Sequence, residues 1–252
     1  MALRRQAQRV AQRALGPAHP ALLRRWRRAQ AANRARRVRS TTRAFVAWHG
    51  LTVSGGPFAG LAYPDAAATS LVPKLLGAYE RELHAVVERA IGERPELIVN
   101  VGAADGYYAV GLARRCPSVV VHAFEADARQ RELLARVAAA NGVAIRIGGA
   151  AGLDDLRALE GRALVVIDCE GCEATLLDPE QVPLLRSATI IAELHDFAVP
   201  GIGDTIAARF ATTHRVTLIP TGAQPPERSS ALALALSEYR PGPMRWAVMI
   251  PR

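Results

Sequence analysis

One acidic residue of this chain lies inside a glycine turn that directly follows a short apolar segment. Residues 97–101 are almost entirely apolar, which is typical of a strand buried on both faces of a parallel sheet. The turn runs from Gly102 to Gly106 and contains Ala103 and Asp105. Because it lacks bulky side chains, a ligand could approach the main chain, and the N–H groups of a following helix would point at that ligand. A carboxylate at Asp105 would repel a pyrophosphate but could pair with an ammonium group.

A second acidic residue, Glu125, follows the next apolar segment, 119–124. A carboxylate at a strand end can accept two hydrogen bonds from a ribose diol, as it does in dinucleotide sites. The dinucleotide fingerprint has the spacing G-x-G-x-x-G, which this turn lacks, so nicotinamide binding is disfavoured. A nucleoside that carries an amino acid satisfies both Asp105 and Glu125, and we therefore predict S-adenosyl-L-methionine as the cofactor. The alternative is an ordinary strand, turn and helix with an acidic helix N-terminus.

A histidine and two further carboxylates fall at the ends of later apolar segments. Asp168 ends segment 163–168, and Glu193 and His195 lie at the end of segment 188–194. Because neighbouring parallel strands end at the same edge of a sheet, His195 could face Asp168 and remove the proton of a hydroxyl acceptor. We predict that these three residues are catalytic, and we assign no metal. In a variant of this hypothesis they bind a divalent cation that positions a diol. Alternatively, His195 is an ordinary residue of a surface loop.

Strands and helices are predicted to alternate from residue 97 onward, which indicates right-handed βαβ units and a parallel sheet. The predicted strands are 97–101, 119–124, 143–147, 163–168, 188–194, 215–219 and 246–250. The helices predicted between them are 107–115, 128–140, 154–159 and 204–211. Segment 231–236 alternates Ala and Leu, and its type stays open between helix and strand.

The charge of the chain is unevenly distributed. Residues 1–64 contain thirteen Arg and no acidic residue, so the total formal charge of +9 leaves −4 for the remainder. We predict an Arg-rich extension, partly helical or disordered, over 1–43. An irregular segment plus a helix over 44–95 could cover the cofactor or substrate, and 96–252 forms the cofactor-binding domain. The Arg-rich block would attract nucleic acid, anionic lipid or acidic protein, and the alternative is a solvated extension.

Composition excludes several other classes of protein. Half of the 252 residues are apolar, which indicates a globular chain. No apolar run approaches the roughly 20 residues needed to span a bilayer, and no apolar segment of a secretory signal follows the basic start. We therefore expect no transmembrane segment and a cytoplasmic location.

The three cysteines, Cys116, Cys169 and Cys172, provide no disulfide framework. Cys169 and Cys172 have the C-x-x-C spacing, but neither a second such pair nor paired histidines would complete a zinc site. We interpret both residues as small apolar members of another motif, with a redox or metal role as the alternative.

Three segments together resemble the class I S-adenosylmethionine-dependent methyltransferases. Residues 99–106 are similar to the first motif of that class, and Phe124-Glu125 is similar to its acidic second motif. Residues 167–173, with the sequence Ile-Asp-Cys-Glu-Gly-Cys-Glu, resemble the I-D-V-E-G-A-E signature of the FkbM-type enzymes. The resemblance covers about residues 97–219, and the two cysteines of the third motif stand where Val and Ala are usual.

The resemblance implies a doubly wound, Rossmann-like α/β fold with a mostly parallel, seven-stranded sheet. The ligand would lie at the carboxyl ends of the strands, where the strand order reverses. The cofactor-binding residues implied in this way are Asn100, Gly102, Ala103, Asp105, Gly106, Glu125 and Asp168. Asn100 could hold the amino-acid part of the cofactor, or its amide could simply bond the backbone at the strand end.

The activity expected from this resemblance is methyl transfer to a hydroxyl of a small molecule or glycan. Lys74, Tyr79 and Glu80 precede the first strand and are candidates for contacts with substrate or with a carboxylate, although an ordinary helix start is the alternative. Glu170 and Glu173 are expected to be structural. Two other classes stay open: a nucleic-acid-associated methyltransferase or binding protein that uses the Arg-rich extension, and a binding module with a vestigial cofactor site.

Overall fold

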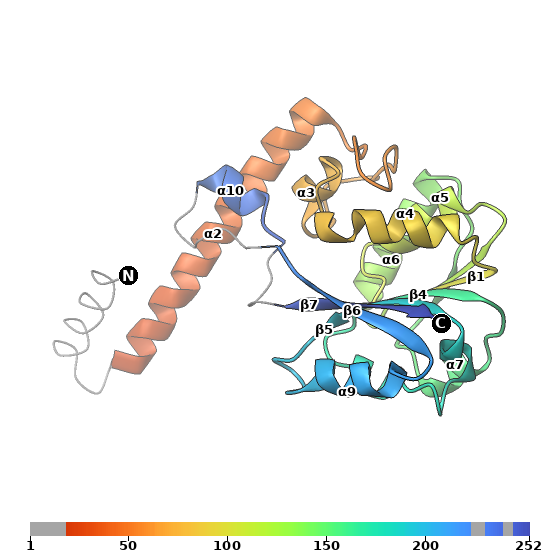
Figure 1. Cartoon of the computed structure of the whole chain (residues 1–252). Coiled ribbons are helices and arrows are strands. Elements are labelled where there is room, and N and C mark those ends of the chain that lie inside the picture. The colour runs from red at the N-terminus through yellow and green to blue at the C-terminus, as the bar shows by residue number, and fades with distance from the viewer. Residues whose placement is uncertain (1–18, 223–229, 239–243) are drawn as a thin grey trace.

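A seven-stranded, mostly parallel sheet forms the centre of the molecule (Figure 1). The computed structural model describes residues 19–222, 230–238 and 244–252. The strands are β1 (Leu97–Val101), β2 (Val120–Phe124), β3 (Arg146–Gly148), β4 (Ala163–Ile167), β5 (Thr189–Leu194), β6 (His214–Pro220) and β7 (Arg245–Pro251). Their order is β3-β2-β1-β4-β5-β7-β6, and β7 runs antiparallel to both of its neighbours. The predicted doubly wound α/β fold is confirmed, with the strand order reversing between β1 and β4.

The registers of the parallel strands bring the carboxyl ends of β1, β2 and β4 to one edge of the sheet. Val101 ends β1 and lies opposite Phe124 of β2 and Ile167 of β4. Glu125 and Asp168 directly follow those two partners, so both acids come to the same edge. Ligands of open α/β sheets bind at this edge, beside the point where the strand order reverses.

Helices cover both faces of the sheet, and each face has its own apolar core (Figure 1). On one face lie α4 (His84–Gly92), α5 (Tyr107–Arg115) and α6 (Ala128–Ala140). On the other lie α7 (Leu153–Arg157), α8 (Glu173–Leu176), α9 (Ile202–Phe210) and the 3-10 helix η3 (Pro183–Arg186). Along β1 the side chains alternate, so that Ile98 joins the first core and Leu97 and Val99 join the second. Two covered faces explain why the sequence of β1 is nearly continuous in apolar residues.

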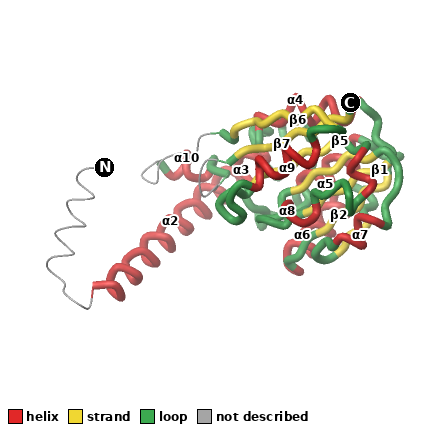
Figure 2. Tube along the Cα trace, turned by 60° about the horizontal axis from the view of Figure 1, so that its bottom comes forward, coloured by secondary structure: helices red, strands yellow, loops and turns green. Residues whose placement is uncertain are grey.

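A long helix, α2 (His19–His49), projects from the domain (Figures 1 and 2). Pro20 lies in its first turn, where N–H groups have no partner within the helix, so proline is tolerated there. The helix continues past the predicted boundary of the extension at residue 43 and ends at His49. Residues 1–18, which the prediction also assigned to this extension, lie outside the described residues.

The short helix α10 (Ala231–Ala235) packs against α2 (Figure 2). Ser230 caps it by accepting a hydrogen bond from Ala233 N, and this decides the open question over 231–236 in favour of a helix. Among the described residues, no helix combines the length and the apolar character needed to cross a bilayer.

The segment between α2 and β1 packs into the domain beside α5. It contains α3 (Leu71–Leu75) and the 3-10 helix η2 (Arg81–Leu83), and all five residues of α3 are buried. Phe58 is 1 % exposed, and its ring meets that of Tyr107 edge-on with centroids 5.0 Å apart. Earlier in this segment, one isolated antiparallel bridge joins Thr52 and Ala62.

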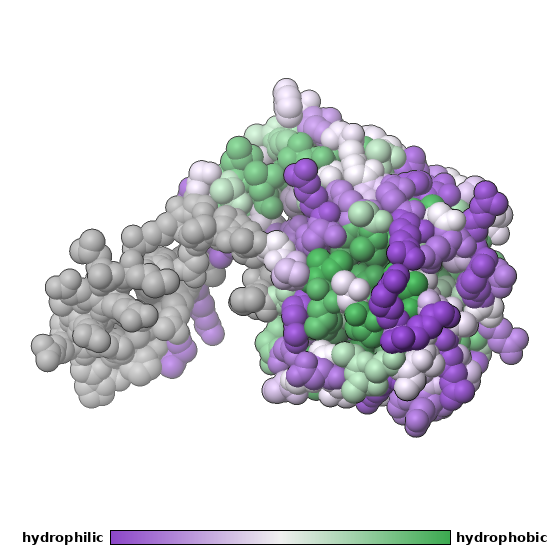
Figure 3. Space-filling model, viewed as in Figure 1, coloured by the Kyte–Doolittle hydropathy of each residue, from purple (hydrophilic) through white to green (hydrophobic). Residues whose placement is uncertain are grey.

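The two edge strands of the sheet are β3 and β6. β3 is short and pairs only with β2, and it begins at Arg146 where the prediction began at residue 143. β6 forms the opposite edge, where Leu218 is 38 % exposed. Figure 3 shows apolar surface in the region where Figure 1 draws β6 and β7, surrounded by polar side chains.

Candidate active site

The turn after β1 is shaped by close contact between parts of the protein itself. Gly102 has a φ of +75°, and a Cβ there would lie 1.6 Å from the carbonyl oxygen of Asp168. Gly106 has a φ of +92°, and its Cβ would lie 2.5 Å from Leu134 Cδ1 of α6. Packing against the backbone therefore requires a glycine at 102, and the positive φ favours one at 106, whether or not a ligand is bound. The sequence alone had connected them only with a ligand.

Glu125 supports the same turn from the end of β2. Its Oε2 accepts a hydrogen bond from Ala104 N (2.8 Å), and its Oε1 accepts one from Asp127 N (2.7 Å). The side chain is half-buried, and each carboxylate oxygen has a second lone pair. A ribose diol could therefore still donate to Glu125, and this role stays a prediction.

Asp105 points inward and has a different partner from the one expected. It is fully buried, and its Oδ2 lies 2.6 Å from Lys74 Nζ and accepts a hydrogen bond from Thr69 N (3.2 Å). Its Oδ1 accepts one from Tyr107 N (3.3 Å) at the start of α5. The charge that Asp105 pairs with is thus Lys74, and this geometry does not favour a direct contact with a cofactor ammonium.

A small hollow lies at the point where the strand order reverses. Its volume is about 40 Å³, and its lining includes Lys74, Asn100, Tyr107, Asp168 and the turn 102–105. Asn100 is 2 % exposed, and its Nδ2 donates to Val166 O (3.2 Å). Its Oδ1 is buried and has no hydrogen-bond partner in the described part of the chain. The amide therefore bonds the backbone through Nδ2, as the alternative interpretation predicts, and a contact of Oδ1 with the cofactor stays a prediction.

A larger hollow of about 380 Å³ lies elsewhere, between α7 and η3 near the amino end of β4. It is lined by Arg157, Glu160 and Leu184 among others, and none of the predicted site residues borders it. The chemistry-bearing side chains gather at the other end of the strands, so we place the candidate site at the smaller hollow.

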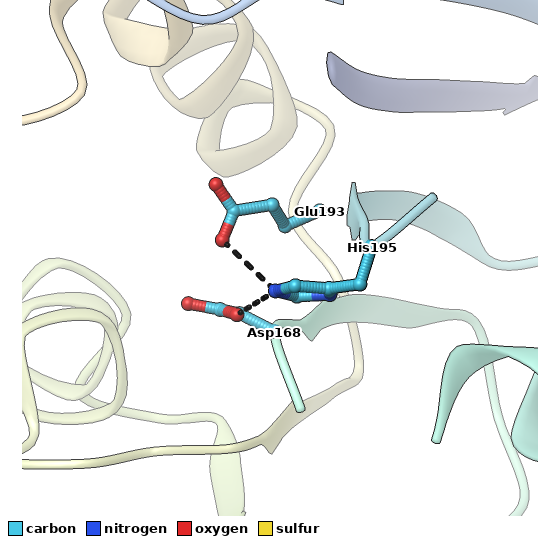
Figure 4. Close-up of side chains that lie close together, drawn as sticks. All are labelled: Asp168, Glu193 and His195. Atoms are coloured by element: carbon cyan, nitrogen blue, oxygen red, sulfur yellow. Dashed lines mark ion pairs between the residues drawn. The ribbon is translucent and has the colours of Figure 1, made fainter. Parts of the chain in front are cut away.

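His195 directly follows β5 and is completely buried at the same edge (Figure 4). Its Nδ1 lies 2.7 Å from Glu173 Oε1, and because a carboxylate only accepts, the ring donates this hydrogen bond. Its Nε2 lies 3.4 Å from Asp168 Oδ1 and 3.6 Å from Glu193 Oε2, and it has no hydrogen-bond partner among the described residues. The predicted trio of Asp168, Glu193 and His195 is thus brought together, although His195 is not on the surface.

The surrounding carboxylates raise the pKa of His195 above its ordinary value. Burial disfavours the charged ring, but the hydrogen bond with Glu173 and the negative charges of Glu173, Asp168 and Glu170 outweigh it. Conversely, the pKa of Glu173 is lowered, because its hydrogen bonds with His195 and with Cys169 N outweigh the effect of burial. The site therefore favours a positive charge at the position of His195 Nε2.

The same geometry would suit a metal ion. One ligand atom each from Asp168, Glu193 and His195 lie within 4.8 Å of one another. When Nδ1–H is held by Glu173, the lone pair of Nε2 faces the two carboxylates, which is the arrangement of most metal-ligating histidines. Two oxygens and one imidazole nitrogen would accept a divalent cation such as Mn²⁺ or Zn²⁺.

Glu173 is the functional residue whose role the sequence did not reveal. The sequence predicts only a structural role for Glu173, which is the first residue of α8. Its contact with His195 was missed because 22 residues separate the two. A signal was present in the third motif, since Asp168 and Glu173 share one short loop and both face His195.

The interpretation of Cys169 and Cys172 as unbonded small residues is corrected, because their sulfurs form a disulfide. Between them, Glu170 and Gly171 both have positive φ, +56° and +115°, and this turn brings the two Cα atoms to 5.5 Å. The distance is within the usual range for a disulfide. The third cysteine, Cys116, is buried and free.

Comparison with known proteins gives structural likeness only. No family model matches the chain, and no curated protein matches its sequence. One similar solved structure is the O-methyltransferase TomG from Streptomyces achromogenes, which is involved in tomaymycin synthesis and was solved in complex with SAM. It shares 18% sequence identity with this chain at a TM-score of 0.46, and the match covers 71% of this chain and 83% of TomG. A second is an O-methyltransferase from Bacillus cereus in complex with SAH. It shares 14% sequence identity at a TM-score of 0.44, and the match covers 64% of this chain and 77% of the Bacillus cereus chain.

A third structure is the SAH-bound methyltransferase PaMTH1 from Podospora anserina. It shares 15% identity at a TM-score of 0.44, covering 68% of this chain and 78% of PaMTH1.

Proposed function

We propose that this chain is an S-adenosylmethionine-dependent methyltransferase that methylates a hydroxyl group of a small molecule or glycan. The observation that carries the proposal is the buried Oδ1 of Asn100, which lies in the hollow where the strand order reverses and has no hydrogen-bond partner within residues 19–222, 230–238 and 244–252. Glu125 closes one side of that edge, and the cluster around His195 closes the other. Along this edge, Glu125 could contact a ribose, Asn100 an amino acid, and the cluster around His195 a reacting hydroxyl.

The residues present fit the cofactor. Glu125 would accept hydrogen bonds from the ribose, Asn100 would meet the amino-acid end, and the small residues Gly102 and Ala103 would lie between them. Asp168 would add negative charge near a sulfonium. When bound, the cofactor supplies a methyl group activated by that positive sulfur.

The protein's own contribution would be alignment and proton handling. Methyl transfer needs the acceptor oxygen in line with the methyl group, which a fixed site achieves by orientation. The proton leaving the hydroxyl would pass to the cluster of His195, Asp168 and Glu193, with Nε2 as the nearest nitrogen acceptor. Glu173 would hold the ring in the tautomer that presents this nitrogen.

A second form of the proposal places a divalent cation on Asp168, Glu193 and His195. Two observations favour it: the ligand atoms of these three residues lie within 4.8 Å of one another, and the carboxylate of Glu173 accepts a hydrogen bond from Nδ1 of the His195 ring. In this form the cation would fix the acceptor and lower the pKa of its hydroxyl. Methyl transfer would then be lost after chelation and restored by added Mn²⁺ or Mg²⁺, whereas the metal-free form is insensitive to chelator.

The third motif is the reason to favour the FkbM type within this class. Its residues Asp168 and Glu173 both contact His195, so the motif carries a connected site. A binding module with a vestigial site is the competing function, and it would bind the cofactor without transferring a methyl group.

Calorimetric titration with S-adenosylhomocysteine tests the cofactor site. We expect binding by the wild type and about 10- to 100-fold weaker binding by Glu125→Gln, since charged hydrogen bonds to the ribose are lost. The matched control is Glu132→Gln, an exposed residue on α6 that should bind as the wild type does. A mass-spectrometric screen of metabolites for a methyl-group gain, with enzyme and S-adenosylmethionine added, then identifies the acceptor.

Absence of both heat and thermal stabilisation with the wild type would overturn the proposal. Binding without methyl transfer to any metabolite in the screen would favour the binding module.

A further inference from the structure

Lys74 is the only lysine of the chain, beside thirty-one arginines, and it is buried in the candidate site. It lies in α3 and is 3 % exposed. Its Nζ is 4.9 Å from the ring centroid of Tyr79 and 5.7 Å from that of Tyr107. Lysine offers a compact point charge with three rotatable donors on a flexible stem, whereas arginine presents a wider, planar guanidinium with a fixed arrangement of donors. The sequence thus departs from its usual cation at a position that lines the hollow.

The hydrogen bonds of this ammonium group are incomplete within the described part of the chain. One donor is directed at Asp105 Oδ2 at 2.6 Å, and the two tyrosine rings provide only cation–π contacts. Two N–H donors are left for a ligand. Asp105 is itself fully buried, so its main effect is to hold the Lys74 ammonium at the wall of the hollow.

Two other polar atoms at the same hollow also lack hydrogen-bond partners among the residues that the structure describes. Asn100 Oδ1 is buried and can only accept, while Tyr107 Oη is buried and can donate. Leaving such groups unpaired costs free energy, so they indicate a ligand with complementary groups. Lys74 and Tyr107 together need an acceptor, preferably an anion, and Asn100 needs a donor, preferably a cation.

We propose that Lys74 binds the carboxylate, and Asn100 the ammonium, of a zwitterionic α-amino acid group. The inference rests on the proposed function, because this group is the homocysteine or methionine end of the cofactor. A hollow of about 40 Å³ has room for such a terminal group but not for a nucleoside, which would lie toward Glu125. Asp105 is then a positioning residue that acts through Lys74 and does not touch the ammonium.

The test compares two adenosine thioethers that differ only in the amino acid. S-Adenosylhomocysteine carries it, and 5′-methylthioadenosine lacks it. The variant is Lys74→Met/Asp105→Asn, which removes both charges and so leaves no unpaired buried ion. The control is Arg136→Met/Asp65→Asn, which removes an exposed ion pair of the same kind.

We expect the double variant to bind S-adenosylhomocysteine about 10- to 100-fold more weakly while its affinity for 5′-methylthioadenosine stays unchanged. Asn100→Leu should shift the ratio of the two affinities in the same direction, and the control should leave it alone. An unchanged ratio in both site variants would overturn the inference while leaving the proposed function intact. If the wild type binds neither compound, the proposed function and this inference fall together.

Chemical acetylation provides a measurement that does not depend on folding of a variant. Lys74 is the only lysine, so a mass spectrum of its peptide reports the reactivity of this one side chain. In the wild type, S-adenosylhomocysteine should slow acetylation of Lys74 much more than 5′-methylthioadenosine does at equal saturation. Equal protection by the two compounds would contradict a contact with the carboxylate.

Discussion

Two glutamates of the disulfide loop differ in what they do for His195. Glu173 is fully buried and holds the ring through Nδ1 at 2.7 Å. Glu170 is 77 % exposed, and its Oε2 lies 3.6 Å from Nε2. Burial gives the first contact a strength that the second cannot have, because water screens exposed charges. The position of the His195 ring therefore depends on Glu173.

Replacement of Glu173 by alanine should destabilise the protein by about 1–3 kcal/mol, because Nδ1–H of His195 and Cys169 N both lose a buried acceptor. Urea unfolding measures the change. The control is Glu170→Ala on the same loop, for which we expect less than about 0.5 kcal/mol. Equal losses for the two variants would show that Glu173 does not hold the ring.

At the scale of elements, the sequence predicted most of the sheet and the identity of the edge that carries the site. The reason is that buried parallel strands are continuous in apolar residues, and the acids that end β2 and β4 interrupt that pattern at Glu125 and Asp168. Helices α5 and α6 also have the predicted bounds, 107–115 and 128–140.

Contacts between distant segments could not be predicted in this way. The pairing of Lys74 with Asp105 depends on how α3 packs over the turn, and no local pattern encodes it. The disulfide of Cys169 and Cys172 needs a positive φ at Glu170, which a non-glycine residue rarely adopts. The full length of the helix α2 could not be predicted because its many arginines leave little amphipathic pattern.

The pairing of β6 with the rest of the sheet contains a group that responds to pH. His214 begins β6 and is 1 % exposed; its Nε2 donates to Ala188 O (2.9 Å), and its Nδ1 accepts from Thr213 Oγ1 (2.8 Å). Both nitrogens are satisfied in the neutral ring, and burial lowers the pKa of His214 despite the bond to Ala188. Protonation would place a second donor against the Thr213 hydroxyl.

We therefore expect His214 to reduce stability in acid. Because its folded pKa is lowered, the unfolded chain binds the proton first, and stability falls as pH drops below about 6.5. At pH 5.5 the loss is at most about 1.4 kcal/mol if the native ring stays neutral. His195 has a raised pKa and contributes a slope of the opposite sign, so the whole-protein slope alone is not informative.

The contribution of His214 is isolated by comparing wild type with His214→Gln in urea unfolding at pH 7.5 and 5.5. The advantage of the wild type should shrink at pH 5.5, since only the wild type loses this stability. The same difference at both values of pH would show that His214 does not titrate between them.

At the scale of the whole molecule, charge is separated between the projecting helix and the domain. Seven arginines of α2 have exposed side chains, at positions 24, 25, 28, 36, 37, 39 and 43. The part of the chain from residue 65 onward carries a formal charge of −4. Since much of α2 extends away from the sheet (Figure 1), its exposed arginines are available to a polyanion.

We expect the wild type to elute from heparin at a higher salt concentration than a variant in which Arg36, Arg37 and Arg39 are replaced by glutamine. Each arginine that contacts a polyanion releases counterions, so the loss should grow as salt is lowered. A matched control replaces three exposed arginines of the domain, Arg81, Arg129 and Arg215. Both variants remove three charges, so a difference between them reports the placement of charge on α2.

Equal elution of the two variants would indicate non-specific attraction and would remove the support for a nucleic-acid-associated function. If only the α2 variant elutes early while its affinity for S-adenosylhomocysteine is unchanged, the basic helix is a separate anion-binding element beside the candidate active site.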